Sequence, residues 1–250
     1  MKAVGKIIGP VSTALFRCLG PAAADDGPTS ESRSVEINGA ETVSAYIKMV
    51  GGELRIRGGG THLLDARFTY DLDEWRPGVS YEVSGTRGKL AVRQPPIGSG
   101  GSGRYEWDLA LSGEVPMELR IEVDTGESEL RLGSLSLTKL EVEQGVGNAV
   151  VDLVGRWRSD LDASITGNAG TITVRVPGDV GVLVQPAKEG FIGGVNAQSL
   201  KHRNGDYVNS AYGRSEATLR IAVELGVGTI NLEVDQAADL QDPNARRCGA

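Results

Sequence analysis

Aromatic residues, cysteine and histidine are scarce in this sequence of 250 residues. Aromatic side chains make up only 5% of the chain, so leucine, valine, isoleucine and alanine have to fill any core. The chain has two cysteines. Removal of a leader after Ala24 would leave only Cys248, and no internal disulfide could then form. We therefore expect a fold that depends on its hydrophobic core rather than on covalent cross-links.

The residue patterns of common catalytic and metal sites are also missing. His62 and His202 have no partners at the spacing typical of metal ligands. The chain has no Gly-x-Ser-x-Gly elbow and no Walker A loop. Residues 98–103 match Gly-x-Gly-x-x-Gly, but no helix follows that could bind a phosphate, so we interpret this run as a loop. The sequence thus predicts no enzymatic activity and no catalytic, cofactor-binding or metal-binding residue.

Long helical periodicity is absent after residue 35, and a repeat of 21 residues takes its place. A second apolar set follows the first at an offset of 11 residues, and the segment between the two sets usually carries glycine. A fixed repeat with alternating apolar residues is typical of stacked β units. The first set is Leu119, Leu140, Leu161 and Val182, the second is Leu130, Val151 and Ile172, and the glycines include Gly52, Gly126, Gly147, Gly167 and Gly228.

These observations predict an all-β fold, in particular a single β-solenoid of the right-handed parallel β-helix type. Each coil would have roughly 21 residues and two short strands, and stacking the coils would make one continuous apolar interior. An antiparallel sandwich of hairpins is the alternative, because glycine-rich links of this length also suit hairpins. The exact recurrence favours the solenoid.

The chain divides into four segments by composition. Residues 1–24 combine a basic start, an apolar middle and a small-residue exit, which together indicate a secretory signal peptide. Residues 25–34 are polar and are predicted to be a flexible linker. The solenoid domain is expected to cover residues 35–234, and residues 235–250 form a polar tail.

Cys18 offers a second interpretation of the leader. A lipoprotein signal places leucine three residues before the lipidated cysteine, as Leu15 does here, but it needs a small residue where this chain has Arg17. A lipid anchor at Cys18 therefore stays an alternative to cleavage after Ala24. The leader is too short and too polar to be a stable membrane span.

The charge of the chain argues against two classes of partner. The formal net charge is −7, and without Lys2, Lys6 and Arg17 there are 23 basic residues against 33 acidic ones, a net charge of −10. Such a balance disfavours binding to nucleic acid and direct docking on anionic lipid.

Several runs of residues resemble one known family in their order along the chain. The runs are Met-Val-Gly-Gly-Glu-Leu-Arg-Ile-Arg-Gly-Gly-Gly at 49–60, Leu-Leu-Asp-Ala-Arg-Phe-Thr-Tyr at 63–70, Ser-Tyr-Glu-Val at 80–83, Val-Arg-Gln-Pro at 92–95, Glu-Trp-Asp-Leu at 106–109 and Tyr-Val-Asn-Ser-Ala-Tyr-Gly at 207–213. Together these runs resemble the N-terminal signature of bacterial toast-rack domains and their adhesin-like repeats. The resemblance covers about residues 31–234, nearly the whole chain after the leader.

The resemblance implies an extracytoplasmic β-solenoid of the cell envelope and brings no enzyme activity with it. We expect a secreted, periplasmic or cell-surface protein that serves in binding or adhesion, or as a scaffold or accessory to a sensor. Its partner would be a protein or glycan of the cell envelope. The alternative is a carbohydrate-active enzyme on a β-helix, which would need two carboxyl groups converging in a groove.

Aromatic residues near loops or strand ends are the candidate binding residues, because flat aromatic faces with polar edges suit sugars and proteins. Trp157 and Tyr105 also lie near loops or strand ends. Any aromatic ring at such a position could instead cap an end of the solenoid. The residues chosen as partner-binding candidates are Trp75, Trp107, Tyr207 and Tyr212.

Asp71, Asp73 and Glu74 form the densest acidic cluster in the sequence. Their oxygens would suit calcium, but the run lacks the glycine and the terminal bidentate acid of a recognised calcium loop. We interpret these residues as solvated charges of a turn and leave calcium open.

Overall fold

A computed structural model describes residues 7–8, 11–14, 27–96, 103–186 and 191–235. The described chain is all-β, apart from one short 3-10 helix, η1 (Asp73–Trp75), and its strands join in a single unclosed sheet. The strands are β1 (Ile7–Ile8), β2 (Val11–Ala14), β3 (Thr29–Val35), β4 (Thr42–Gly58), β5 (Leu64–Tyr70), β6 (Gly78–Ser84), β7 (Arg87–Arg93), β8 (Tyr105–Leu111), β9 (Met117–Arg131), β10 (Leu137–Asp152), β11 (Leu161–Pro177), β12 (Gly181–Pro186), β13 (Ile192–Ala197), β14 (Lys201–Arg203), β15 (Asp206–Val208) and β16 (Thr218–Asp235).

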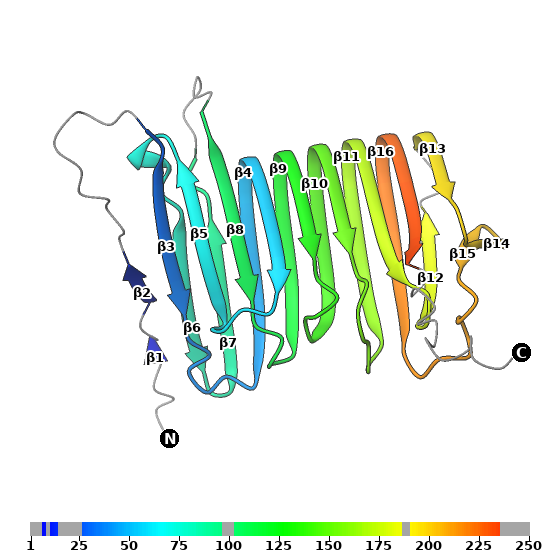
Figure 1. Ribbon diagram of the computed structural model, residues 1–250, viewed down its shortest axis with the longest axis horizontal. Coiled ribbons are helices and arrows are strands. Elements are labelled where there is room, and N and C mark those ends of the chain that lie inside the picture. Colours follow the sequence, from blue (N-terminus) through cyan, green and yellow to red (C-terminus); the bar gives the residue numbers. More distant parts are fainter. Residues whose placement is uncertain (1–6, 9–10, 15–26, 97–102, 187–190, 236–250) are drawn as a thin grey trace, which may run out of the picture.

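Five long strands, β4, β9, β10, β11 and β16, form the middle of the molecule. Each runs up one side, bends over at the top and returns down the other, so that the five stand side by side as arches (Figure 1). We call the part before the bend the first leg, the part after it the second leg, the row of bends the crest, and the opposite ends the base. Burial alternates along both legs, which places the apolar side chains between the two layers.

The arches pair in parallel, as the repeat predicted, and the hairpin alternative is wrong for this region. Between β9 and β10 the step equals the predicted repeat, because Leu119 lies opposite Leu140 and Leu130 lies opposite Val151. Between β10 and β11 the step is longer by two, because Leu140 lies opposite Ala163 rather than Leu161. The strict repeat therefore fails at β11.

The apolar pattern could not reveal this change of register. Side chains alternate between the two faces of a strand, so a shift by two positions leaves every apolar side chain on the same face. Leu161 and Ala163 are both buried, and so are Ile172 and Val174. A step of 21 and a step of 23 residues would thus bury the same side chains. The longer step is the one that aligns the bend glycines Gly147 and Gly170.

The chain also does not add its arches in sequence order. Leu161 of β11 lies opposite Leu219 of β16, and Val182 of β12 lies opposite the same Leu219 from the other side. The fifth arch, β16, is thus inserted between β11 and the short strands β12 and β13. Leu161 and Val182, which the sequence places on neighbouring coils, are separated by this inserted strand.

The crest is built from glycine in every arch. Gly52, Gly126, Gly147, Gly170 and Gly228 lie opposite one another in register and have φ angles between +130° and +138°. A Cβ atom on Gly147 would overlap the carbonyl oxygen of Gly126, and the same overlap recurs at the next arches. Glycine is required here by both the backbone angle and the close approach of neighbouring backbones. The crest glycine of β11 is Gly170, not the predicted Gly167.

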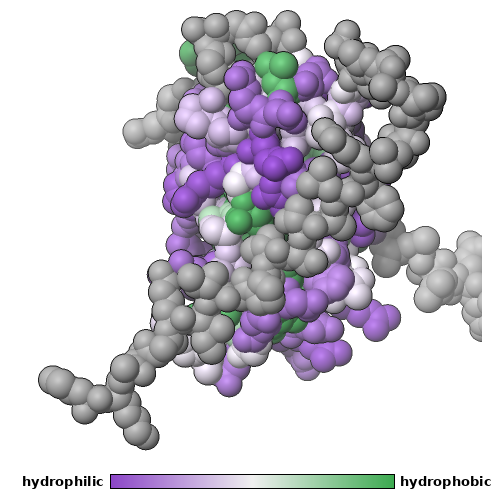
Figure 2. All heavy atoms as spheres, turned by 90° about the vertical axis from the view of Figure 1, so that its left-hand side faces the viewer, coloured by the Kyte–Doolittle hydropathy of each residue, from purple (hydrophilic) through white to green (hydrophobic). Residues whose placement is uncertain are grey.

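At the N-terminal end of the stack, β7 and β8 pair in parallel with the two legs of β4, and antiparallel pairs continue the sheet beyond them. β3, β5 and β8 continue the second-leg layer beside β4, and β6 and β7 continue the first-leg layer. Because β3 begins at Thr29 and pairs along its whole length with β5, the predicted linker over residues 25–34 is wrong from Thr29 onward. Figure 2 views this end from outside, and its visible described surface is mostly hydrophilic.

Two short strands of the predicted leader lie at this same end. β1 pairs with β6, and β2 pairs with β3, both antiparallel. Cys18, the small-residue exit at 22–24, the loop at 97–102 and the tail at 236–250 lie outside the described residues. Among the residues that are described, no helix has the length and apolar character needed to cross a membrane.

We predict that Gly147→Ala lowers the free energy of unfolding by about 3 kcal/mol or more, because it adds a Cβ at a strained φ and against the Gly126 carbonyl. Urea unfolding of the full chain measures the change. Gly194→Ala is the matched control, because a Cβ there meets nothing within 4 Å. An equal loss in the two variants would contradict the role of the crest glycines.

Candidate binding surfaces

Two of the four candidate aromatic residues, Trp75 and Trp107, are buried. Their exposed fractions are 3% and 0%, and both belong to the hydrophobic core at the N-terminal end of the stack. The Trp107 ring meets Phe68 edge-on at 5.4 Å between centroids, and the Trp75 ring meets Tyr105 at 6.1 Å. Direct contact of these two indoles with a partner is therefore ruled out in this structure. Both indoles are part of the hydrophobic core at this end of the stack.

Tyr207 and Tyr212 lie near the opposite end, at β15 and in the turn that follows it. Both are half-buried, and the ring of Tyr207 packs against His202 at 5.1 Å between centroids. The structure does not bring them near Trp75 and Trp107, which pack among β5, η1 and β8. The four residues thus do not form one site, and the two tyrosines stay a prediction.

The acidic loop and His62 have local partners. Asp71 accepts a hydrogen bond from the backbone N–H of Arg104 at 2.6 Å, and Asp73 and Glu74 are exposed in η1. His62 contacts Asp65 at 2.6 Å, and this hydrogen bond raises the pKa of the imidazole. Over the described ranges, no group of three or more acidic, histidine or cysteine side chains is placed to hold a metal ion.

A groove of about 450 Å³ opens on the first-leg face, where β7, β4, β9 and β10 lie side by side. Its wall carries charges of both signs, and Arg93 lies over the Tyr46 ring at 5.1 Å from the centroid. The lining residues are Ser44, Ala45, Tyr46, Ser80, Glu82, Lys89, Leu90, Ala91, Arg93, Glu118, Leu119, Arg120, Lys139 and Glu141.

Arg120 forms ion pairs with three acids in and beside this groove. Its guanidinium pairs with Glu122 at 2.8 Å on its own strand and reaches Glu141 at 3.0 Å and Glu143 at 2.8 Å on β10. On the other side, Lys48 of β4 pairs with Glu122 at 3.1 Å. Opposite charges therefore alternate across three neighbouring arches, which removes the repulsion that stacked like charges would cause.

Glu122 is the most strongly perturbed acid of the network. Burial alone would raise its pKa, but hydrogen bonds from Tyr46, Arg120 and Lys48 outweigh this effect and lower the pKa to about 2. The pKa of Glu141 is also lowered, chiefly by its hydrogen bond with Lys139. Carboxyl groups that stay ionised at neutral pH cannot donate a proton, whereas a glycosidase needs one acid with a raised pKa.

A second hollow, of about 540 Å³, lies at the base among the loops that join β9 to β10 and β10 to β11. Trp157 is half-buried in its wall and donates its indole N–H to the Leu153 carbonyl at 2.8 Å. Arg156 and Arg158 flank it and are exposed. The lining residues are Pro116, Gly133, Ser134, Leu135, Ser136, Leu137, Thr138, Val154, Gly155, Arg156, Trp157, Arg158 and Ser159.

The base hollow is the better candidate for a ligand site, and none of the four aromatic candidates lies in it. Its volume falls in the usual range for small-molecule sites, roughly 300–1,000 Å³. Arg156 and Arg158 have no ion-pair partner among the described residues, so their charges are available to an anionic group. The signal in the sequence was the run Arg-Trp-Arg at 156–158, an aromatic residue between two cations in a loop.

Comparison with known proteins identifies similar chains. The family model described as the N-terminal domain of toast_rack, DUF2154, matches residues 24–175. The solved structure of a putative cell adhesion protein from Clostridium sporogenes ATCC 15579 is 32% identical and has a TM-score of 0.78. The match covers 83% of the present chain and 99% of that chain.

A solved structure of a putative adhesin from Bacteroides fragilis NCTC 9343 is also similar over 82% of the present chain and 97% of its own. Its identity is 13% and its TM-score is 0.27, so this likeness supports no conclusion. No protein of curated function matches the chain.

We predict that Glu122→Gln lowers the free energy of unfolding at pH 7 by about 1–3 kcal/mol. Because the folded-state pKa is depressed from 4.5 to about 2, the carboxylate stabilises the fold above pH 4.5 and loses this effect as the pH falls toward 2. The difference between the variant and the original chain should therefore shrink over that window in urea unfolding. Glu224→Gln, at an exposed acid of β16, is the control and should change little. A loss that does not depend on pH would contradict the prediction.

Proposed function

Because the chain belongs to the toast-rack family, we propose that it is a non-enzymatic binding protein of the cell envelope that acts in adhesion. The observation that carries the proposal is the likeness to the Clostridium sporogenes protein, which covers almost all of that chain. Long, paired arches with charged outer faces support it further, because a rigid sheet presents its outward side chains at fixed spacing. A scaffold or accessory to a membrane sensor differs from this function only in the partner.

The base hollow is the proposed ligand site, and an acidic glycan of the envelope is the proposed ligand. The Trp157 ring offers a flat face for a sugar, and the exposed guanidinium groups of Arg156 and Arg158 can bind carboxylate or sulfate groups. The serine hydroxyls of the lining, such as Ser134, supply donors and acceptors for sugar hydroxyls.

The five arches are proposed to be coils of one right-handed β-solenoid. The parallel registers of β4, β9, β10, β11 and β16 support it. Stacked coils with no long free loops at the crest would hold the base hollow in a fixed shape, which reduces the entropy lost on binding.

The location is proposed to be extracytoplasmic, with the leader cleaved after Ala24 or with lipid attached at Cys18. The basic start and small-residue exit of the leader support export. We expect cell fractionation to recover the protein outside the cytoplasm. Mass spectrometry of its N-terminus should give a chain that begins at Asp25 or carries lipid on Cys18. A cytoplasmic chain with Met1 intact would contradict this location.

The alternative, a carbohydrate-active enzyme, is less well supported. All carboxyl groups of the described chain with a clear shift have a lowered pKa, so a general acid of the usual kind is not among them. These groups are Glu31, Asp65, Glu122, Glu141 and Asp160.

We predict that the full chain binds uronic-acid and sialic-acid glycans on an array and does not bind their neutral counterparts. Arg156→Gln combined with Arg158→Gln should weaken this binding about tenfold or more, because it removes both charge-assisted contacts. Lys201→Gln combined with Arg203→Gln is the matched control, since it removes the same charge from exposed β14.

Two outcomes would overturn the proposal. Equal losses in the two double variants would mean that binding follows net charge rather than the base hollow. The chain could also release reducing ends from a glycan of the array. If that release were lost when one Asp or Glu is replaced by its amide, the enzyme alternative would be supported instead.

A further inference from the structure

Beside the crest glycines lies a row of four apolar side chains, three of them exposed and one, Ala169, half-buried. Val146, Ala169, Val227 and Ile192 lie opposite one another on β10, β11, β16 and β13. The exposed fractions are 52% for Val146, 51% for Val227 and 70% for Ile192. We call these four residues the crest row.

The crest row is unusual for this surface. Four large hydrophobic side chains are strongly exposed within the described chain, and three of them belong to the row. Elsewhere on the legs most outward positions carry polar or charged side chains, as Arg120 and Glu141 do, and the outward apolar Val150 is half-buried. Single exposed apolar residues are common on soluble proteins, but a contiguous line of them is typical of an interaction site.

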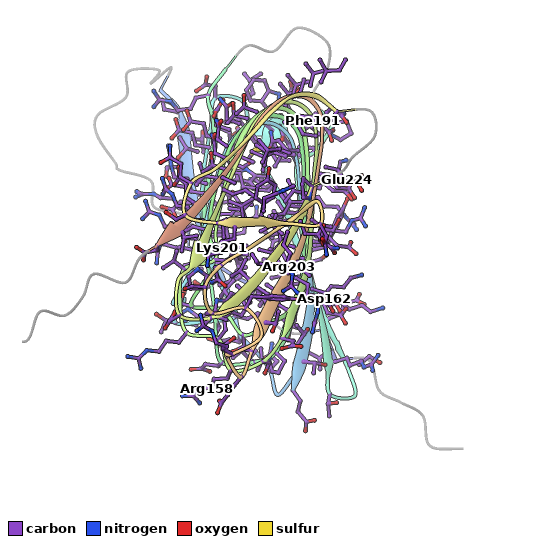
Figure 3. All side chains as sticks on the ribbon, turned by 90° about the vertical axis from the view of Figure 1, so that its right-hand side faces the viewer. Arg158, Asp162, Phe191, Lys201, Arg203 and Glu224 are labelled. Atoms are coloured by element: carbon purple, nitrogen blue, oxygen red, sulfur yellow. The ribbon has the colours of Figure 1, made fainter. Side chains whose placement is uncertain are left out.

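Acidic residues border the crest row. The segments centred on the bends of four arches, 122–128, 143–149, 166–172 and 224–230, contain five acids and no lysine or arginine. Glu127 and Glu224 are exposed and have no ion-pair partner within the described ranges. Figure 3 shows the stack from its C-terminal end, with Phe191 at the crest, Glu224 just below it and Arg158 at the opposite, base end. Three of the five acids, Glu122, Asp124 and Glu143, pair with Lys48 or Arg120, which leaves Glu127 and Glu224, among the described residues, as the unpaired acids beside the row.

We propose that the crest row is a docking surface for a partner protein segment that forms an amphipathic helix with lysine or arginine beside its apolar stripe. Charge complementarity selects this occupant, because basic side chains beside the stripe would meet the exposed, unpaired Glu127 and Glu224. An anionic lipid surface would meet those same acids and be repelled. A second copy docked crest to crest would place acid against acid.

The spacing of the row suits a helix that lies across the arches. Neighbouring strands are about 4.8 Å apart, so the four residues span roughly 15 Å. Helix residues three or four positions apart lie about 5–6 Å from each other on one face. Three turns of helix, about 16 Å long, would therefore place roughly one apolar side chain on each arch.

The test uses the full chain and a synthetic probe, a fluorescent peptide of about 12 residues with leucine on one helical face and lysine on the other. Binding is measured by fluorescence anisotropy at two salt concentrations. The comparison probe has glutamate in place of every lysine. We expect the lysine peptide to bind, with an affinity that falls as salt rises, and the glutamate peptide not to bind.

The variant Val146→Thr, Val227→Thr and Ile192→Thr keeps β-branched side chains but adds three hydroxyls to the row, and it should weaken peptide binding about tenfold or more. Val150→Thr, the same change on the second-leg face of β10, is the control and should leave binding unchanged. Glu127→Gln with Glu224→Gln should weaken binding severalfold and reduce its dependence on salt.

Three results would overturn the inference. The triple threonine variant could bind the lysine peptide as tightly as the original chain, or the glutamate peptide could bind equally well. Alternatively, the chain could bind phosphatidylglycerol vesicles, and the triple threonine variant could lose this binding. That result would make the partner a membrane. The inference is independent of the base hollow, because the Arg156 and Arg158 variant should bind the peptide normally.

Discussion

Close contact between backbones at the crest is the constraint on which the rest of the structure depends. Each arch must reverse its direction within a few residues, and each bend must lie against the bend of its neighbour. The carbonyl oxygen of one crest glycine occupies the space in which a Cβ of the next would stand, as between Gly126 and Gly147. A side chain at these positions would force neighbouring arches apart, and the registers of both legs would be lost together.

Equal registers in the two layers have consequences for the surface as well as for the core. Inside, apolar residues from successive arches form continuous layers that end at the aromatic cluster around Trp107. Outside, side chains fall into rows across the sheet, so one long residue such as Arg120 can pair with acids on its own strand and on the next. The same regularity turns Val146, Val227 and Ile192 into a line rather than scattered positions.

The candidate surfaces differ in how far they could be predicted. Aromatic residues were reasonable candidates for recognition, yet Trp75 and Trp107 are buried, where they pack against Tyr105 and Phe68. A tryptophan near a loop looks the same in sequence whether it faces solvent or core. Trp157 reaches a hollow only because the loops after β9 and β10 stack beside each other. The crest row likewise depends on β16 and β13 being neighbours, although Ile192 and Val227 are far apart in the chain.

The sequence by itself indicated the all-β class from local alternation, the glycine-rich bends from backbone freedom, and the parallel stacking of Leu119 on Leu140 from the 21-residue repeat. Only the tertiary structure decided the longer step from β10 to β11, since a shift by two positions keeps every side chain on its own face. It also decided that β16 lies between β11 and β12, because pairing between segments so distant in the chain leaves no local pattern. Which outward residues gather into a groove, a hollow or a crest row follows from that order of strands, and so it lies beyond what the repeat could reveal.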